Sequence, residues 1–202
     1  KIVQGLLALC ILVTLYNMWT FADRAMLVSD LINESGAVTT SQAIDADNAV
    51  QASSLLSLGG VVLTGILWIV WFHRSYKNVT VLARRQLAHS PGWAIGGCFV
   101  PFLNFVRPTQ IADDMFAASS FATPGALARS VPRVVTVWWS LWIISSIVGR
   151  VVARSSRGDS LSSLRTSDWI AAFAGVLTIA AAIAAIMVVR ELTSRQHAHG
   201  VA

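Results

Sequence analysis

The residues whose types and spacing could support chemistry lie near the middle of this chain. Arg107, Gln110 and Asp114 recur at intervals of three and four positions, so they share one face of a helix. This face suits two roles. It can be a solvated, self-paired surface, with Arg107 bound to Asp114 or to a lipid headgroup. Alternatively, together with the basic turn Arg74–Lys77, it can line a polar pocket that holds a lipid phosphate or a small anion.

Catalytic chemistry is not indicated by the other polar residues. The chain has four histidines, but they are not part of a His-Glu-x-x-His motif, and Gly-x-Ser-x-Gly and phosphate-binding glycine loops are missing. Asp45, Asp47 and Asn48 lack the glycine and distal glutamate of a calcium loop. Cys10 and Cys98 form no Cys-x-x-Cys pair. We therefore expect no enzymatic activity, no cofactor and no metal site.

Four apolar stretches must position these residues, and they indicate a membrane protein. Residues 2–22, 52–72, 134–153 and 169–189 are almost free of charge. About 20 apolar residues, at about 1.5 Å per residue, cross a hydrocarbon layer about 30 Å thick. The composition, 55% hydrophobic and 12% charged, is unlike that of soluble domains. We expect an all-α fold, an integral membrane four-helix bundle that forms one domain over residues 1–202.

A short apolar segment between the second and third spans is broken by a proline. Residues 93–106 are too few to cross comfortably, and Pro101 removes a backbone donor in their middle. We expect this segment to re-enter from the cytoplasmic side or to lie in the interface. Backbone groups freed by the break need partners from neighbouring helices, and Asn104 is a candidate partner. An amphipathic interfacial helix should follow from Arg107.

The distribution of charge sets the expected orientation. If both termini and the insertion 73–133 are cytoplasmic and the loop 23–51 is external, ten of the 15 Lys and Arg residues lie inside, as the positive-inside rule requires. Tryptophans at the helix ends are expected to form interfacial belts. They are Trp19 and Trp169 on the outer side and Trp68, Trp71, Trp138 and Trp139 on the inner side.

Small residues recur at four-residue spacing in two of the spans, which lets helix backbones approach closely. We expect these faces to close the bundle itself, and association with a second copy of the chain is the alternative. The pairs are Ala171/Gly175, Ala181/Ala185 and Gly60/Thr64.

Three linked motifs carry a family resemblance: Trp71-Phe-His-Arg-x-Tyr-x-Asn78, Ser90-Pro-Gly-Trp-Ala-x-Gly-x-x-Phe-x-Pro-Phe-x-Asn104 and Arg107-Pro-x-Gln110. They resemble the bacterial family called domain of unknown function 4328, which is common in actinobacteria. The resemblance runs from the first span to the fourth. It implies a multi-spanning protein of the bacterial cytoplasmic membrane and implies no reaction. The chain has Thr109 where members often have Tyr, and Asp114-Met115-Phe116 where an acidic-aliphatic-Trp triplet is common.

The spans contain no ionisable residue in their interiors, which argues against a path for charge. We therefore expect an accessory or scaffold subunit of a larger membrane complex, with membrane lipids and other membrane-protein subunits as partners. Nucleic acid is not expected, because the basic residues lie in loops next to anionic headgroups. The alternative is a transporter or binding protein for lipid or small molecules, with a site near the re-entrant segment. The expected contact residues are Arg74, Tyr76, Lys77, Asn78, Asn104, Arg107, Gln110 and Asp114.

Overall fold

A computed structural model of the chain describes residues 1–33, 38–82, 87–119, 132–155 and 160–198. These residues form six α-helices and one 3-10 helix, and no strand occurs among them. The elements are α1 (Ile2–Asn33), α2 (Thr40–Leu82), α3 (Trp93–Phe99), the 3-10 helix η1 (Leu103–Phe105), α4 (Arg107–Ala118), α5 (Arg133–Ser155) and α6 (Leu161–Ala198). Within the described residues, α1, α2, α5 and α6 are long and apolar enough to cross a membrane. The all-α membrane fold is thus confirmed.

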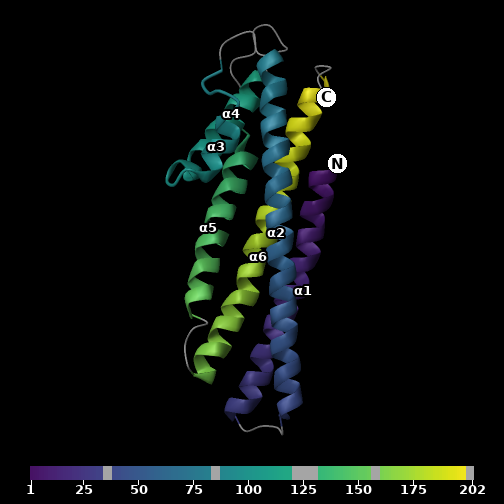
Figure 1. The fold of residues 1–202 in the computed structure, drawn as a ribbon, viewed down its shortest axis with the longest axis vertical. Helices are drawn as coiled ribbons and strands as arrows, with labels where there is room; N and C mark the ends of the chain where they lie inside the picture. The colour runs from purple at the N-terminus through teal and green to yellow at the C-terminus, as the bar shows by residue number, and fades with distance from the viewer. Residues whose placement is uncertain (34–37, 83–86, 120–131, 156–159, 199–202) are drawn as a thin grey trace.

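The four long helices form an elongated bundle in which α6 runs obliquely between α5 and the α1–α2 pair (Figure 1). Helix α1 packs against α2 and α6, and α5 packs against α6. Helix α1 begins and α6 ends toward the same end of the bundle, and α3 and α4 lie beside α5 toward that end (Figure 1). The termini and the insertion therefore share one end of the molecule. That this end is cytoplasmic stays a prediction, and Arg84, Arg85, Arg129 and Arg157, which contribute to it, lie outside the described residues.

Most of the expected external loop 23–51 is helical. Helix α1 continues to Asn33 and α2 begins at Thr40. Helix α1 continues because it still has a packed face, on which Ala25 and Val28 are buried. The start of α2 is capped reciprocally. The Thr39 amide donates to Gln42 Oε1 over 2.8 Å, and the Gln42 amide donates to Thr39 Oγ1 over 3.3 Å.

Charged side chains tie these helical extensions together. The Arg24 guanidinium donates to both carboxylate oxygens of Asp168 over 2.9 and 2.7 Å, and to Asp47 Oδ1 over 3.0 Å. Asp168 is only 1% exposed. A bidentate pair of this kind is stronger than a neutral hydrogen bond, and it satisfies a carboxylate that would be costly to bury alone. Arg24 of α1 thereby joins α6 and α2 at the end opposite the insertion.

Small residues let α1 and α6 approach closely. Ala181 and Ala185 are buried, and a Cβ atom at Gly175 would overlap the Met18 side chain of α1. A Cβ atom at Gly60 would lie 3.6 Å from Cys10 Sγ, so α1 and α2 are also in close contact there. These faces close the bundle within one chain, as expected.

The tryptophans near the insertion differ from the prediction. The ring of Trp68 in α2 lies tilted at 5.0 Å from the ring of Trp138 in α5, which in turn lies 5.2 Å from the ring of Trp139. Trp138 and Trp139 are 4% and 9% exposed. They are core residues that join α2 to α5, and the prediction of an interfacial belt is wrong for them. The reason is that the insertion packs over the start of α5 and covers the indoles.

We predict that Gly175→Ala destabilises the bundle, because the added methyl group overlaps Met18. Overpacking of this kind costs about 1–3 kcal/mol of unfolding free energy. Equilibrium unfolding of the purified protein in detergent micelles measures the change. Gly65→Ala is the matched control, since a Cβ atom there meets nothing within 4 Å. Equal stability of the two variants would contradict the close α1–α6 packing, whereas Met18→Ala should rescue Gly175→Ala.

The orientation is testable with single cysteines in a chain whose Cys10 and Cys98 are replaced by alanine. Asn48 and Lys77 are both exposed and lie toward opposite ends of α2. With the insertion in the cytoplasm, a membrane-impermeant maleimide added to intact cells labels Asn48→Cys. It labels Lys77→Cys only after the cells are permeabilised. The reverse pattern would show that the predicted orientation is inverted.

Candidate functional site

The Pro-broken segment is a tight hairpin. Helix α3 ends at Phe99, and the chain reverses at Pro101–Phe102. The Leu103 amide donates to the Pro101 carbonyl over 2.8 Å, which makes a γ-turn centred on Phe102 at φ 64° and ψ −40°. Phe102 carries this strained backbone with its ring 84% exposed. The segment thus folds back beside α5 without crossing the bundle.

A tryptophan supplies the hydrogen bond that the hairpin needs from a neighbouring helix. Trp139 Nε1 of α5 donates to the Phe105 carbonyl over 2.6 Å. Asn104, the expected partner for freed backbone groups, does not fill this role. Its side-chain oxygen is buried and has no partner among the described residues. The prediction failed for Asn104 because the indole comes from a helix far away in the sequence.

Four polar residues from α2, the turn before α3, and α4 form a connected group, which we call the His89 cluster: Tyr76, His89, Arg107 and Asp114. Tyr76 is fully buried, and its one hydroxyl proton is shared between two acceptors, the His89 carbonyl at 2.7 Å and Asp114 Oδ2 at 3.1 Å. His89 Nδ1 lies 2.8 Å from Asp114 Oδ2, and its Nε2 is hydrogen-bonded to Arg107 Nη1. Because a guanidinium only donates, Nε2 must accept, and Nδ1 must carry the proton given to Asp114.

Arg107 fixes the hairpin against α4. Its Nη1 donates to Gln110 Oε1 over 3.1 Å, and its guanidinium carbon lies 4.8 Å from the centre of the Trp93 ring. The backbone of α3 passes so close that a Cβ atom at Gly97 would collide with the Arg107 side chain. Glycine is therefore required at position 97. Arg107 Nε is buried without a hydrogen-bond partner among the described residues.

The structure brings together some of the expected contact residues. Tyr76, Arg107, Gln110 and Asp114 meet around His89. Arg107 and Asp114 do not pair directly as expected, because the imidazole lies between them. The other four lie apart from these contacts. Arg74 and Lys77 are exposed on α2, Asn78 is half-buried, and Asn104 lies in η1.

Sequence reasoning missed His89 and the Arg24–Asp168 pair. His89 stands directly before the Ser90-Pro-Gly motif, and this position was the sequence feature that could have identified it as a site residue. Asp168 stands directly before the fourth apolar run, and Arg24 follows the first. Opposite charges at the same end of two adjacent spans were the signal for their pairing.

The hydrogen bonds of the His89 cluster connect its four members to one another. A histidine that acts as a general base commonly has one ring nitrogen bound to a carboxylate and accepts a proton at the other. In His89 that other nitrogen, Nε2, already accepts a hydrogen bond from Arg107. Burial, followed by the negative charge of Asp114, raises the pKa of Asp113. Burial also raises the pKa of the Cys98 thiol, which disfavours its reactive thiolate. Among the described residues, no group of three or more His, Cys, Asp or Glu could hold a metal ion.

The elements of this site coincide with a known family. A model of the family described as Domain of unknown function (DUF4328) matches residues 34–194. The chain belongs to this family. The DUF4328 match covers α2 through most of α6, including the whole His89 cluster. Searches of curated proteins and of solved structures found no match.

The chain's departures from the usual DUF4328 pattern are accommodated locally. Phe116, at the aromatic position after Asp114, is 1% exposed and lies 5.1 Å below the Arg195 guanidinium of α6. An aromatic contact is therefore present there. Thr109 instead donates its hydroxyl to the Val106 carbonyl over 2.7 Å, within the first turn of α4.

We predict that Asp114→Ala loosens the insertion, because it removes the acceptor shared by His89 and Tyr76. The His89 Nδ1–H is then left unpaired, which costs about 1–3 kcal/mol, whereas Tyr76 keeps the His89 carbonyl as its acceptor. Faster hydrogen exchange of the α4 amides, measured by mass spectrometry, is the expected result. Gln110→Ala is the control, since Gln110 is exposed and only accepts one bond from Arg107. Unchanged exchange in Asp114→Ala would show that the cluster does not hold α4 in place.

Proposed function

We propose that this protein is a non-enzymatic accessory or scaffold subunit of a larger membrane complex, which contacts lipid and partner subunits at the end that carries the insertion. The observation that carries the proposal is the His89 cluster, whose hydrogen bonds dock the hairpin and α4 against α2. Such a network suits a rigid platform better than it suits a reaction centre.

The charge of this end supports contact with anionic groups. Arg74 and Lys77 of α2 and Arg190 of α6 are exposed. Gln196 Nε2 of α6 donates to the Ser75 carbonyl over 3.0 Å, so the ends of α2 and α6 are held side by side. We propose that the exposed cations Arg74, Lys77 and Arg190 act together as one basic face. Each basic residue near an anionic membrane surface contributes about 1 kcal/mol to binding.

The hairpin supports contact with lipid or with apolar partner surfaces. Phe99 and Phe102 are 70% and 84% exposed at its tip. Aromatic rings are favoured at the level of lipid headgroups, where an apolar body meets a wet boundary. The hairpin tip and the basic face together give this end one apolar and one charged contact region.

A second candidate function, binding of lipid or small molecules, is favoured by a different observation. A cavity of about 290 Å³ lies between the long helices. It is lined by α1, α2, α5 and α6 rather than by the re-entrant segment.

We predict that the double change Arg74→Glu and Lys77→Glu weakens the binding of anionic lipid more than tenfold, since two contributions of about 1 kcal/mol are lost and two repulsions are added. Native mass spectrometry of the protein with phosphatidylglycerol measures the occupancy. The same change should remove membrane-protein partners that co-purify stoichiometrically from native membranes in mild detergent.

The control for this experiment is Arg154→Glu, an exposed cation of α5 at the opposite end of the bundle. It should change neither lipid occupancy nor co-purification. A wild-type protein that leaves native membranes without any stoichiometric partner would count against the subunit function. Equal lipid occupancy in all three proteins would count against the basic face.

A further inference from the structure

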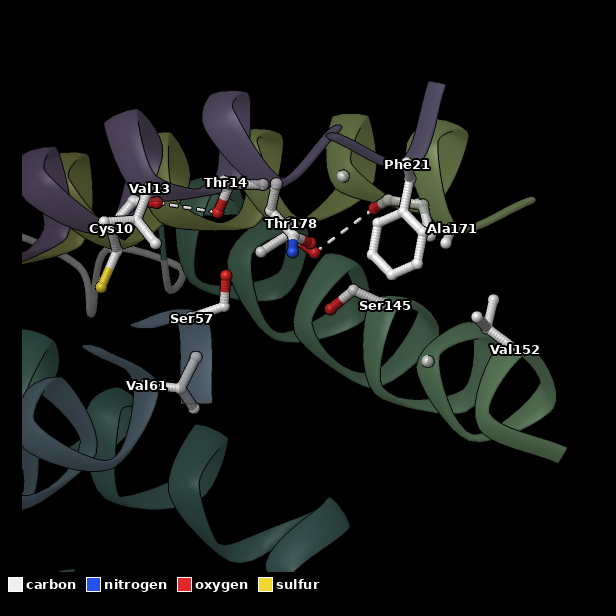
Figure 2. A pocket seen from close by; sticks show the side chains of 14 residues that line it. Cys10, Val13, Thr14, Phe21, Ser57, Val61, Ser145, Val152, Ala171 and Thr178 are labelled. Carbon is white, nitrogen blue, oxygen red and sulfur yellow. Dashed lines mark hydrogen bonds between the residues drawn. The ribbon is translucent and has the colours of Figure 1, made fainter. Parts of the chain in front are cut away.

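The cavity between the long helices is mostly apolar, with six polar side chains in its wall: Cys10, Thr14, Asn17, Ser57, Ser145 and Thr178. Figure 2 shows the Ser57 hydroxyl pointing from α2 into the cavity, with side chains of α1, α5 and α6 around it. None of the 14 lining residues is charged. An occupant must therefore be uncharged and mainly apolar.

The cavity exists because α2 and α5 are joined near one end only. Trp68 and Trp138 bring the two helices together beside the insertion. Ser57 and Val61 precede this contact in α2, and Ser145 and Gly149 follow its partner in the antiparallel α5. The cavity thus lies within the apolar spans, where molecules dissolved in the bilayer have access and water is scarce.

The polar side chains of the wall are satisfied internally, with one exception. Five of the six make hydrogen bonds within the bundle, such as Asn17 Nδ2 to Ser53 Oγ at 2.9 Å. Ser57 Oγ is buried and has no hydrogen-bond partner among the described residues. A buried hydroxyl without a partner costs free energy in an apolar setting, and a ligand that supplies one hydrogen bond there would remove this cost.

We propose that this cavity is a binding site for a single neutral, chain-like lipid whose one uncharged oxygen function, a hydroxyl or a carbonyl, hydrogen-bonds to Ser57. The lining selects the occupant, because it is uncharged and mostly apolar and offers one unpartnered hydroxyl, that of Ser57, to a single oxygen function. The cavity volume of about 290 Å³ is close to the lower limit of small-molecule sites, which suits one narrow chain. This site goes beyond the subunit function and does not depend on it.

The test uses the purified full-length protein in phosphatidylcholine nanodiscs and a photoreactive diazirine derivative of hexadecanol. Cross-linking to cavity peptides should saturate and be competed by hexadecanol. Ser57→Ala should weaken labelling about fivefold, as expected for one lost hydrogen bond of about 1 kcal/mol. It should not change labelling by the corresponding diazirine alkane, which has no hydroxyl. Equal loss with both probes, or no loss with either, would overturn the role of Ser57.

Blocking the cavity provides the second arm. A Cβ atom at Gly149 meets nothing within 4 Å, so Gly149→Leu adds bulk to the cavity wall without a steric clash at that atom. It should abolish saturable labelling. Gly59→Leu adds the same bulk at an exposed position of α2 that does not line the cavity, and should leave labelling unchanged. Labelling that rises linearly with probe, resists competition and is equal in both variants would mean that bulk phospholipid chains alone occupy the space, and would refute the site.

Discussion

A buried polar group needs a hydrogen-bonding partner inside the protein, and this constraint accounts for the polar contacts that join the helices. Where the backbone breaks at Pro101, the Trp139 indole reaches the Phe105 carbonyl. Where Asp168 is buried, Arg24 binds both of its oxygens. Where Tyr76 is buried, its hydroxyl finds His89 and Asp114. In each case a residue distant in sequence supplies the partner, so the polar contacts also fix which helices are neighbours.

Several such contacts hold the insertion in place. Its hairpin is held by Trp139 from α5, by Arg107 against Trp93, and by His89 between Arg107 and Asp114. Next to the insertion, the contact between Trp68 and Trp138 closes one end of the interface between α2 and α5. The rest of the interface between α2 and α5 stays open. The docked insertion and the cavity therefore both follow from the way α2 and α5 pack.

The features that the sequence predicted well are those with local causes. Long uncharged runs require spanning helices, and Pro101 within 93–106 requires an interrupted element. The four-residue spacing of small residues correctly indicated a close helix contact at Gly175. The mistaken features depend on tertiary partners. Trp138 and Trp139 have the position of an interfacial belt, but the insertion buries them, and no local pattern reports that cover.

The candidate site was less predictable than the fold for the same reason. Arg107, Gln110 and Asp114 were identified from helical spacing, but their spacing could not reveal that an imidazole sits between the charges. His89 lies outside any helix, so no periodicity marks it. The cavity was equally hidden, because its walls come from four helices and its unpartnered Ser57 hydroxyl resembles any other serine of a span.

The pairing of α1 with α6 has a consequence for biosynthesis. These helices lie far apart in the sequence, yet Gly175 packs on Met18 and Arg24 binds Asp168. During translation α1 enters the membrane long before α6 is made, so the α1 surface around Met18 faces lipid and Arg24 lacks Asp168 in the meantime. The bundle therefore closes only after the ribosome has delivered α6, and the nascent chain must be tolerated, or chaperoned, as an open intermediate until then.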